Sequence, residues 1–174
     1  MTSLLFVCTG NATRSVMAGE LARLARPDWD VVTAGTFVVE GLSISWRTRG
    51  AMAEIGIAAP GHRSTQLTAA HVDVADLVIV QEYQHVQYVR RNHPSGAART
   101  ATLKRLARDL GHGPKPLAER VAALGPASVE LEPDWEDVVD PGGGEIEDFV
   151  ACAHEVAALM DELIPRLGVR VPQP

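Results

Sequence analysis

The chain has 174 residues, of which 46% are hydrophobic and 22% charged, proportions typical of one globular domain with a core of its own. The net charge of −6 argues against a general nucleic-acid-binding protein, which would present a basic face. No stretch approaches the roughly 18 apolar residues of a membrane span, and the N-terminus lacks the basic region of a signal peptide. Two cysteines, Cys8 and Cys152, are too few for a disulfide framework or a cysteine-pair zinc site. We therefore expect a cytoplasmic protein without membrane or nucleic-acid partners.

The first predicted elements are a strand and a helix joined by a short loop. The apolar run Leu4–Val7 predicts a buried strand, and residues 16–25 predict a helix. In the loop between them, Gly10 and Asn11 tolerate positive φ, so the backbone can curl and aim several N–H groups at one point. Because a helix N-terminus lies behind it, this loop is a candidate phosphate site.

Strands and helices alternate along the rest of the chain. Further strands are predicted over residues 30–35, 77–80 and 101–103. Helices are predicted over residues 46–55, 69–72, 84–92, 106–110, 117–124 and 145–167, with Ser45 and Thr68 as N-caps. Residues 128–139 are acidic and irregular, and 140–144 form a loop. The alternation predicts an α/β domain with a mostly parallel sheet, whose ligands bind at the carboxyl ends of the strands.

The residue types in the first loop are suited to breaking a phosphate ester. Cys8 can attack phosphorus, because a helix N-terminus and inward-pointing N–H groups favour the thiolate. The planar guanidinium of Arg14 matches two phosphate oxygens. Ser15 can donate a hydrogen bond to the sulfur, and the Asn11 amide can brace the loop. This chemistry also needs a proton donor from elsewhere in the chain.

The segment from Phe6 to Ala18, Phe-Val-Cys-Thr-Gly-Asn-Ala-Thr-Arg-Ser-Val-Met-Ala, resembles the signature of the low-molecular-weight protein tyrosine phosphatases. The resemblance continues in chain order through residues 33–36, 62–64, 66–68 and 75–78, and closes with Asp140-Pro141. It implies one three-layer α/β/α domain over residues 1–168, followed by a tail of residues 169–174. The implied sheet has four parallel strands in the order 2-1-3-4, with the phosphate loop (P-loop) between strand 1 and helix 1. It also implies dephosphorylation through a phosphocysteine intermediate, without a metal or cofactor.

The same resemblance assigns roles to individual residues. Cys8 is the implied nucleophile, Arg14 binds the phosphoryl group, and Asp140 is the general acid. The implied phosphate-binding loop consists of Thr9, Gly10, Asn11, Ala12, Thr13, Arg14 and Ser15. The implied supports of that loop are Asn11, Ser15 and His62.

The surroundings of Asp140 independently favour it as the proton donor. One carboxyl group can protonate the leaving oxygen and then activate water against the phosphocysteine. Pro141 presets the backbone on one side of Asp140, and Gly142–Gly144 leave it flexible on the other. The nearby Glu136 and Asp137 are interpreted as solvated loop charges.

Three features depart from the family pattern. Thr13 stands where family members usually carry a second loop cysteine, so Cys8 loses a route to reversible oxidation. Ala12 is smaller than the aliphatic residue associated with phosphotyrosine or the threonine associated with phosphoarginine. Gly142–Gly144 replace the aromatic residues that wall the pocket of tyrosine-specific members. Phe37 and Trp46 are the predicted pocket wall, with Trp135 as a further candidate.

The other cysteine and most histidines are predicted to be structural. Cys152 lies on the last predicted helix as a buried packing residue. No metal site is expected, because the remaining histidines lack metal-ligand spacing and are interpreted as surface or packing residues: His71, His85, His93, His112 and His154.

The leading predicted function is hydrolysis of phosphate monoesters, with protein phosphotyrosine as the substrate. The alternatives are a protein phosphoarginine phosphatase, a catalytically impaired anion-binding regulator, and a relative of arsenate reductases. The last is disfavoured because no cysteine lies between Cys8 and Cys152. Expected partners are a phosphorylated protein or a small phosphate ester, with phosphate, sulfate or vanadate as active-site anions. The chain is expected to be a monomer or weak dimer.

Overall fold

A computed structural model describes residues 1–168, so the predicted tail of residues 169–174 lies outside the described residues. Four parallel strands form one sheet in the order β2-β1-β3-β4, which confirms the predicted fold class and strand order. Their bounds are Ser3–Cys8 for β1, Asp30–Gly35 for β2, Leu77–Val80 for β3 and Thr100–Thr102 for β4. Because β1 lies between β2 and β3, its carboxyl end is central in the sheet.

Helices connect and flank these strands. Their bounds are Arg14–Ala25 (α1), Trp46–Glu54 (α2), Ala69–Val74 (α3), Tyr83–Asn92 (α4), Leu103–Asp109 (α5), Leu117–Ala122 (α6), Pro133–Glu136 (α7) and Ile146–Leu167 (α8), with a 3-10 helix η1 at Pro94–Arg99. Both predicted N-caps are confirmed. Ser45 Oγ accepts from the backbone N–H of Thr48 at 3.0 Å, and Thr68 Oγ1 accepts from that of His71 at 3.4 Å.

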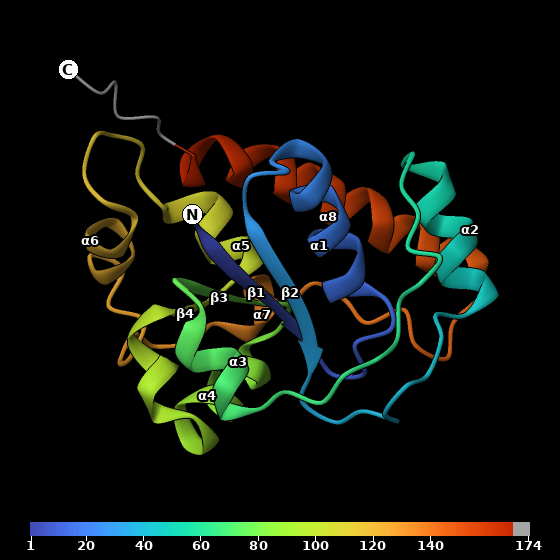
Figure 1. The fold of residues 1–174 in the computed structure, drawn as a ribbon, viewed down its shortest axis with the longest axis horizontal. Coiled ribbons are helices and arrows are strands. Elements are labelled where there is room, and N and C mark those ends of the chain that lie inside the picture. Colours follow the sequence, from blue (N-terminus) through green and yellow to red (C-terminus); the bar gives the residue numbers. More distant parts are fainter. Residues whose placement is uncertain (169–174) are drawn as a thin grey trace.

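The helices cover both faces of the sheet and give the molecule three layers (Figure 1). On one face, Leu4 and Phe6 of β1 belong to a core completed by α1, α2, α5 and α8. On the other face, Leu5 and Val7 belong to a second core with α3 and α4. This burial on both sides explains the continuous apolar run of β1, since successive side chains of a strand point to opposite faces.

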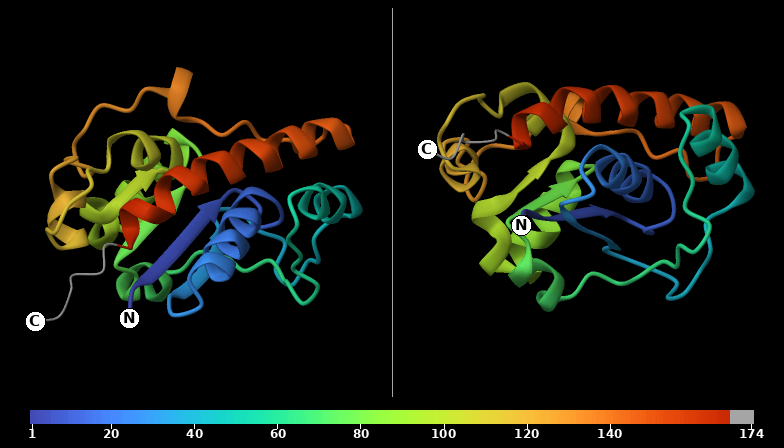
Figure 2. Two further views of the ribbon diagram at one scale, coloured as in Figure 1. Left: turned by 90° about the horizontal axis from the view of Figure 1, so that it is seen from above. Right: turned by 45° about the horizontal axis from the view of Figure 1, so that its top comes forward.

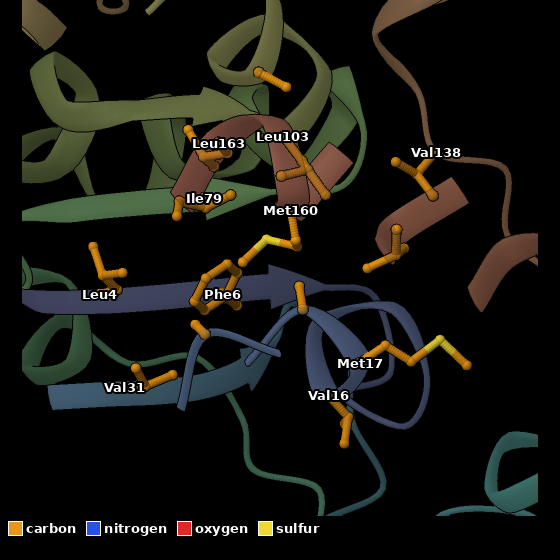
Figure 3. Packing of buried hydrophobic residues seen from close by; sticks show 14 of the residues in the cluster. Leu4, Phe6, Val16, Met17, Val31, Ile79, Leu103, Val138, Met160 and Leu163 are labelled. Carbon is orange, nitrogen blue, oxygen red and sulfur yellow. The ribbon is translucent and has the colours of Figure 1, made fainter. Parts of the chain in front are cut away.

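The connection from α6 to α8 passes α7 and reaches the N-terminal end of α8 (Figure 2). It carries Asp140, which is thereby brought to the carboxyl end of β1. The long helix α8 then runs back over the sheet, and Figure 3 shows Met160 of α8 facing Phe6 of β1. Both side chains are fully buried, so α8 fixes both the core and the segment that precedes it.

Two local predictions are wrong in detail. The fourth strand ends at Thr102, whereas residues 101–103 were expected, because Leu103 begins α5. The Thr102 hydroxyl accepts from the backbone N–H of Arg105 at 3.2 Å and caps that helix. The acidic stretch 128–139, expected to be irregular, contains the short helix α7. Within residues 1–168, no helix is both long and apolar enough to cross a membrane.

Candidate active site

The loop from Cys8 to Ser15 curls at Asn11, whose φ of 49° lies in the left-handed region. Three neighbours hold this conformation. The backbone N–H of Thr65 donates to Asn11 Oδ1 at 2.9 Å, while Ser64 Oγ and His62 Nε2 donate to the Asn11 carbonyl oxygen at 2.9 and 2.7 Å. The structure therefore places the predicted supports Asn11 and His62 in direct contact.

The outer side of the loop rests on the end of β2. The backbone N–H groups of Thr36 and Phe37 donate to the carbonyl oxygens of Cys8 and Thr9, both at 3.0 Å. Gly35 permits this approach, because a Cβ there would lie 2.5 Å from Thr9 O. Among the described residues, no hydrogen bond occupies the backbone N–H groups of residues 10–13. Those groups remain available to an anion at the N-terminus of α1.

The Cys8 sulfur lies 3.1 Å from Ser15 Oγ. Asn11 Nδ2 donates to the same hydroxyl oxygen at 3.0 Å, which leaves the Ser15 proton to point toward the sulfur. Such a hydrogen bond can stabilise negative charge that develops on the sulfur during a reaction. Both Asn11 and Ser15 are fully buried, so this chain of contacts is shielded from water.

Arg14 is buried and makes three charged or polar contacts. Its Nη1 donates to Glu82 and, at 2.8 Å, to the carbonyl oxygen of Val138, while its Nη2 donates to Asp140 Oδ2 at 2.6 Å. Burial acts to lower the pKa of Arg14, but the charges of Cys8, Asp140 and Glu82 outweigh it and raise that pKa. The guanidinium is therefore held charged and oriented.

Asp140 closes the site from the opposite side. The pocket above the loop has a volume of about 270 Å³ and is lined by Cys8, Thr9, Gly10, Ala12, Thr13, Arg14, Asp140 and Gly142. The carboxylate of Asp140 also accepts from the backbone N–H of Gly142 at 2.9 Å. The structure thus gathers the predicted nucleophile, phosphoryl-binding residue and general acid around one pocket.

Thr13, in the place of the usual second cysteine, connects this pocket to α2. Its hydroxyl lies 3.1 Å from Thr48 Oγ1, which lies 3.1 Å from Ser45 Oγ. The three hydroxyls form a chain from the loop to the N-cap of α2. Thr13 therefore supports the loop through a hydrogen bond to the side chain of Thr48 on α2.

His85 was predicted to be a surface or packing residue, and that interpretation misses its contact with the loop. Its Nδ1 accepts from the backbone N–H of Glu82 at 3.2 Å, so Nε2 carries the proton toward Thr9 Oγ1 at 3.0 Å. Burial, together with the charge of Arg14, lowers the pKa of His85 to about 3. One signal was available in the sequence: Glu82 and His85 follow β3, whose carboxyl end adjoins that of β1.

The predicted wall residues Phe37 and Trp46 are not among the residues that line the pocket. Phe37 is 83% exposed and Trp46 is 58% exposed, and Trp46 lies against Arg47, whose guanidinium carbon is 4.8 Å from the ring centre. Trp135 lies under Arg108 at 3.5 Å. Small residues line the pocket together with Arg14 and Asp140, so these aromatic side chains do not form a ring-stacking wall in this structure.

The interpretation as a solvated charge is wrong for Glu136, and Asp137, which is partly buried, also has a hydrogen-bond partner in the protein. Glu136 is fully buried, and Arg105 Nε donates to it at 3.0 Å. Asp137 Oδ1 accepts from the backbone N–H of Tyr83 at 2.7 Å. Sequence reasoning missed both partners because they lie far away along the chain.

Cys152 is buried in the core, as predicted, and burial raises the pKa of its thiol to about 12. It also lines a second hollow, of about 350 Å³, which shares Asp140 and Gly142 with the loop pocket. No group of three or more metal-binding side chains occurs within residues 1–168.

Comparison with known proteins identifies the family. Residues 3–118 match the family model for the low molecular weight phosphotyrosine protein phosphatases. A protein-arginine-phosphatase from Geobacillus stearothermophilus is 32% identical over 94% of this chain and 95% of its own. A probable low molecular weight protein-tyrosine-phosphatase, EpsP from Ralstonia nicotianae, is 36% identical over 60% of this chain and 70% of its own. A solved structure of the YwlE arginine phosphatase from Geobacillus stearothermophilus superposes with a TM-score of 0.76, covering 96% of this chain and 93% of that one. The chain belongs to the low-molecular-weight phosphotyrosine protein phosphatase family.

Proposed function

We propose that this protein is a cysteine-dependent phosphatase that hydrolyses phosphotyrosine in proteins through a phosphocysteine intermediate. The observation that carries this proposal is the meeting of Cys8, Arg14 and Asp140 around one pocket whose loop offers unoccupied N–H groups. Inorganic phosphate, sulfate and vanadate are the expected active-site anions. The proposed compartment is the cytoplasm.

In the first step, the Cys8 thiolate attacks phosphorus and the bond from phosphorus to the ester oxygen breaks. Arg14 Nη1 is committed to Glu82 and Val138. Two phosphoryl oxygens therefore bind at the edge formed by Nε and Nη2, where they displace Asp140 from Nη2. Asp140 gives its proton to the leaving oxygen. In the second step, the Asp140 carboxylate takes a proton from water, which attacks the phosphocysteine and releases phosphate and the thiolate.

The test begins with p-nitrophenyl phosphate in the presence of a chelator. Turnover should persist with the chelator and should fall on the order of 10⁴-fold or more in Cys8→Ser, while that variant still binds vanadate. Turnover that survives Cys8→Ser, or that the chelator stops, would contradict the mechanism.

Asp140→Asn tests the proton donor separately. For phenyl phosphate, whose leaving group is poor, kcat/KM should fall roughly 10²-fold or more. For p-nitrophenyl phosphate the loss should be much smaller, because that leaving group departs without a proton. Equal losses for both esters would remove Asp140 from the acid role.

Protein phosphoarginine is the second candidate substrate, and a specific observation favours it. The pocket is lined by small residues, Arg14 and the carboxylate of Asp140, without an aromatic ring among them. A carboxylate suits a guanidinium leaving group better than a phenol, and the relatives that match nearly the whole chain include protein-arginine-phosphatases.

A peptide panel decides between the two substrates. Phosphotyrosine, phosphoarginine and phosphoserine in one sequence context would be compared by kcat/KM. A preference for phosphotyrosine supports the leading proposal, and a preference for phosphoarginine replaces it with the second. Preference for phosphoserine would contradict both.

A further inference from the structure

Asp140 lies between a segment that carries a buried ion pair and a turn that contains three glycines. After Asp140 the chain continues through Pro141 into Gly142–Gly144, and Gly143 has a φ of 84°. A run of glycines leaves the backbone conformationally free. Besides the hydrogen bond from Gly142, the position of the carboxylate depends on the residues that precede it, which we call the acid segment (residues 132–140).

Glu136 is the most deeply anchored charge of the acid segment. Its carboxylate is fully buried and accepts from Arg105 Nε at 3.0 Å and also from Arg105 Nη2. It further accepts from Thr102 Oγ1 and the backbone N–H of Glu132, both at 2.8 Å. Burial acts to raise the pKa of Glu136, but these hydrogen bonds outweigh it and lower that pKa. The carboxylate is thus charged and fixed by donors from β4, α5 and its own segment.

This anchor is linked to the reacting groups through a short stretch of backbone that includes the buried Val138. Two residues after Glu136, Val138 donates its backbone N–H to Gln81 O at 2.8 Å, and its carbonyl oxygen accepts from Arg14 Nη1 at 2.8 Å. Asp140 follows two residues later and meets Arg14 Nη2. A shift of Glu136 would move Val138, which orients Arg14, and Asp140 with it.

We infer that Glu136, held by Arg105 and Thr102, is a positioning residue for the proton-transfer step. The inference rests on the proposed function, because it assumes that Asp140 protonates the leaving group. Glu136 touches no reacting atom and acts through Val138 and Asp140. A buried ion pair does not by itself indicate that the pair stabilises the fold. Here the pair of Glu136 and Arg105 has another role, because it fixes the position of the acid segment.

The experiment compares Glu136→Gln with wild type on two esters. The readout is the ratio of kcat/KM for p-nitrophenyl phosphate to that for phenyl phosphate, in which the fraction of folded enzyme cancels. Glu136→Gln keeps the size of the side chain and removes the charge that holds Arg105. The ratio should rise about tenfold or more, in the same direction as in Asp140→Asn. An unchanged ratio would overturn the inference, whatever happens to thermal stability.

Glu132→Gln is the matched control. Glu132 lies near the same arginine, 3.6 Å from Arg105 Nη2, but its side chain is 57% exposed. Its ratio should stay within about twofold of wild type, since exposed ion pairs contribute little. A rise as large as in Glu136→Gln would mean that any charge change in the segment suffices, and the inference would be lost.

A double variant shows whether Glu136 acts through Asp140. With Asp140→Asn already present, adding Glu136→Gln should leave the ratio unchanged, because the proton donor is absent. A further rise would contradict the proposed path. Failure of the proposed function is distinguishable, because it would appear as turnover that survives Cys8→Ser.

Discussion

At the residue scale, the histidine beside the phosphate loop has a consequence for stability. His85 is buried and neutral, and its pKa is lowered from 6.5 to about 3. In the unfolded chain it binds a proton below about pH 6.5, which the folded protein does not accept until about pH 3. The unfolded state thus binds more protons in this window, so stability falls as the pH falls.

We expect His85→Asn to flatten this pH dependence. As pH falls from about 6.5, His85 should cost wild type up to about 1.4 kcal/mol of unfolding free energy per pH unit. Urea unfolding between about pH 7 and about pH 4.5 measures the two slopes. His112→Gln changes an exposed histidine and should leave the slope unaltered. Parallel slopes for wild type and His85→Asn would contradict this assignment.

At the scale of elements, the phosphate loop depends on the end of β2. Gly35 pairs with Cys8 in the sheet, and a Cβ at Gly35 would lie 2.5 Å from Thr9 O and 2.8 Å from Asn11 N. Both contacts are with backbone atoms of the loop, so the rotation of a side chain cannot relieve the clash. The loop therefore has to move if position 35 gains a methyl group.

We expect Gly35→Ala to lower kcat/KM about tenfold or more, because small displacements of a reacting group are costly. It should also destabilise the fold by about 1–3 kcal/mol through overpacking. Gly61→Ala is the control, since a Cβ at Gly61 meets nothing within 4 Å. Steady-state kinetics and thermal unfolding measure both effects. Full activity in Gly35→Ala would show that the loop tolerates the displacement.

The loop could be predicted from the sequence because its residues are consecutive. Cys8, Asn11, Arg14 and Ser15 lie between one strand and one helix, so local pattern was sufficient. Glu136 was misjudged, since its burial depends on Arg105, 31 residues away along the chain, and hydrophobic patterning does not report buried ion pairs. Topology, rather than local pattern, brings such pairs together.

The direction in which an individual side chain points could not be predicted from the sequence either. Phe37 is predicted to wall the pocket, and its backbone N–H donates to the carbonyl oxygen of Thr9. Its ring is nevertheless 83% exposed and does not line the pocket. Period-2 alternation ends with the strand, so it could not predict where a residue just beyond β2 would point.

At the scale of the whole molecule, α8 closes the domain. Its stripe of Met160, Leu163 and Leu167 is buried against the sheet, and every residue of the proposed site lies before α8. The domain proposed for residues 1–168 therefore contains both the core and the site.

Removing residues 169–174 should leave kcat/KM within about twofold of the full chain. A second truncation that begins at Met160 should unfold the protein, since each lost buried side chain costs about 2–5 kcal/mol. Circular dichroism and turnover of p-nitrophenyl phosphate measure both. Loss of activity on removal of residues 169–174 alone would place part of the functional domain beyond Gly168.

The carboxylate of Asp140 accepts from Arg14 Nη2 at 2.6 Å, a donor that an incoming phosphoryl group would also use. Under the proposed mechanism, an arriving phosphoryl group competes with the carboxylate for the Nη2 donors of Arg14. A phosphate dianion that displaces the carboxylate frees it to take up a proton from water and to face the leaving group. An anion that binds too weakly to displace it leaves the acid tied to the arginine. Recognition of the substrate and release of the proton donor are then a single event.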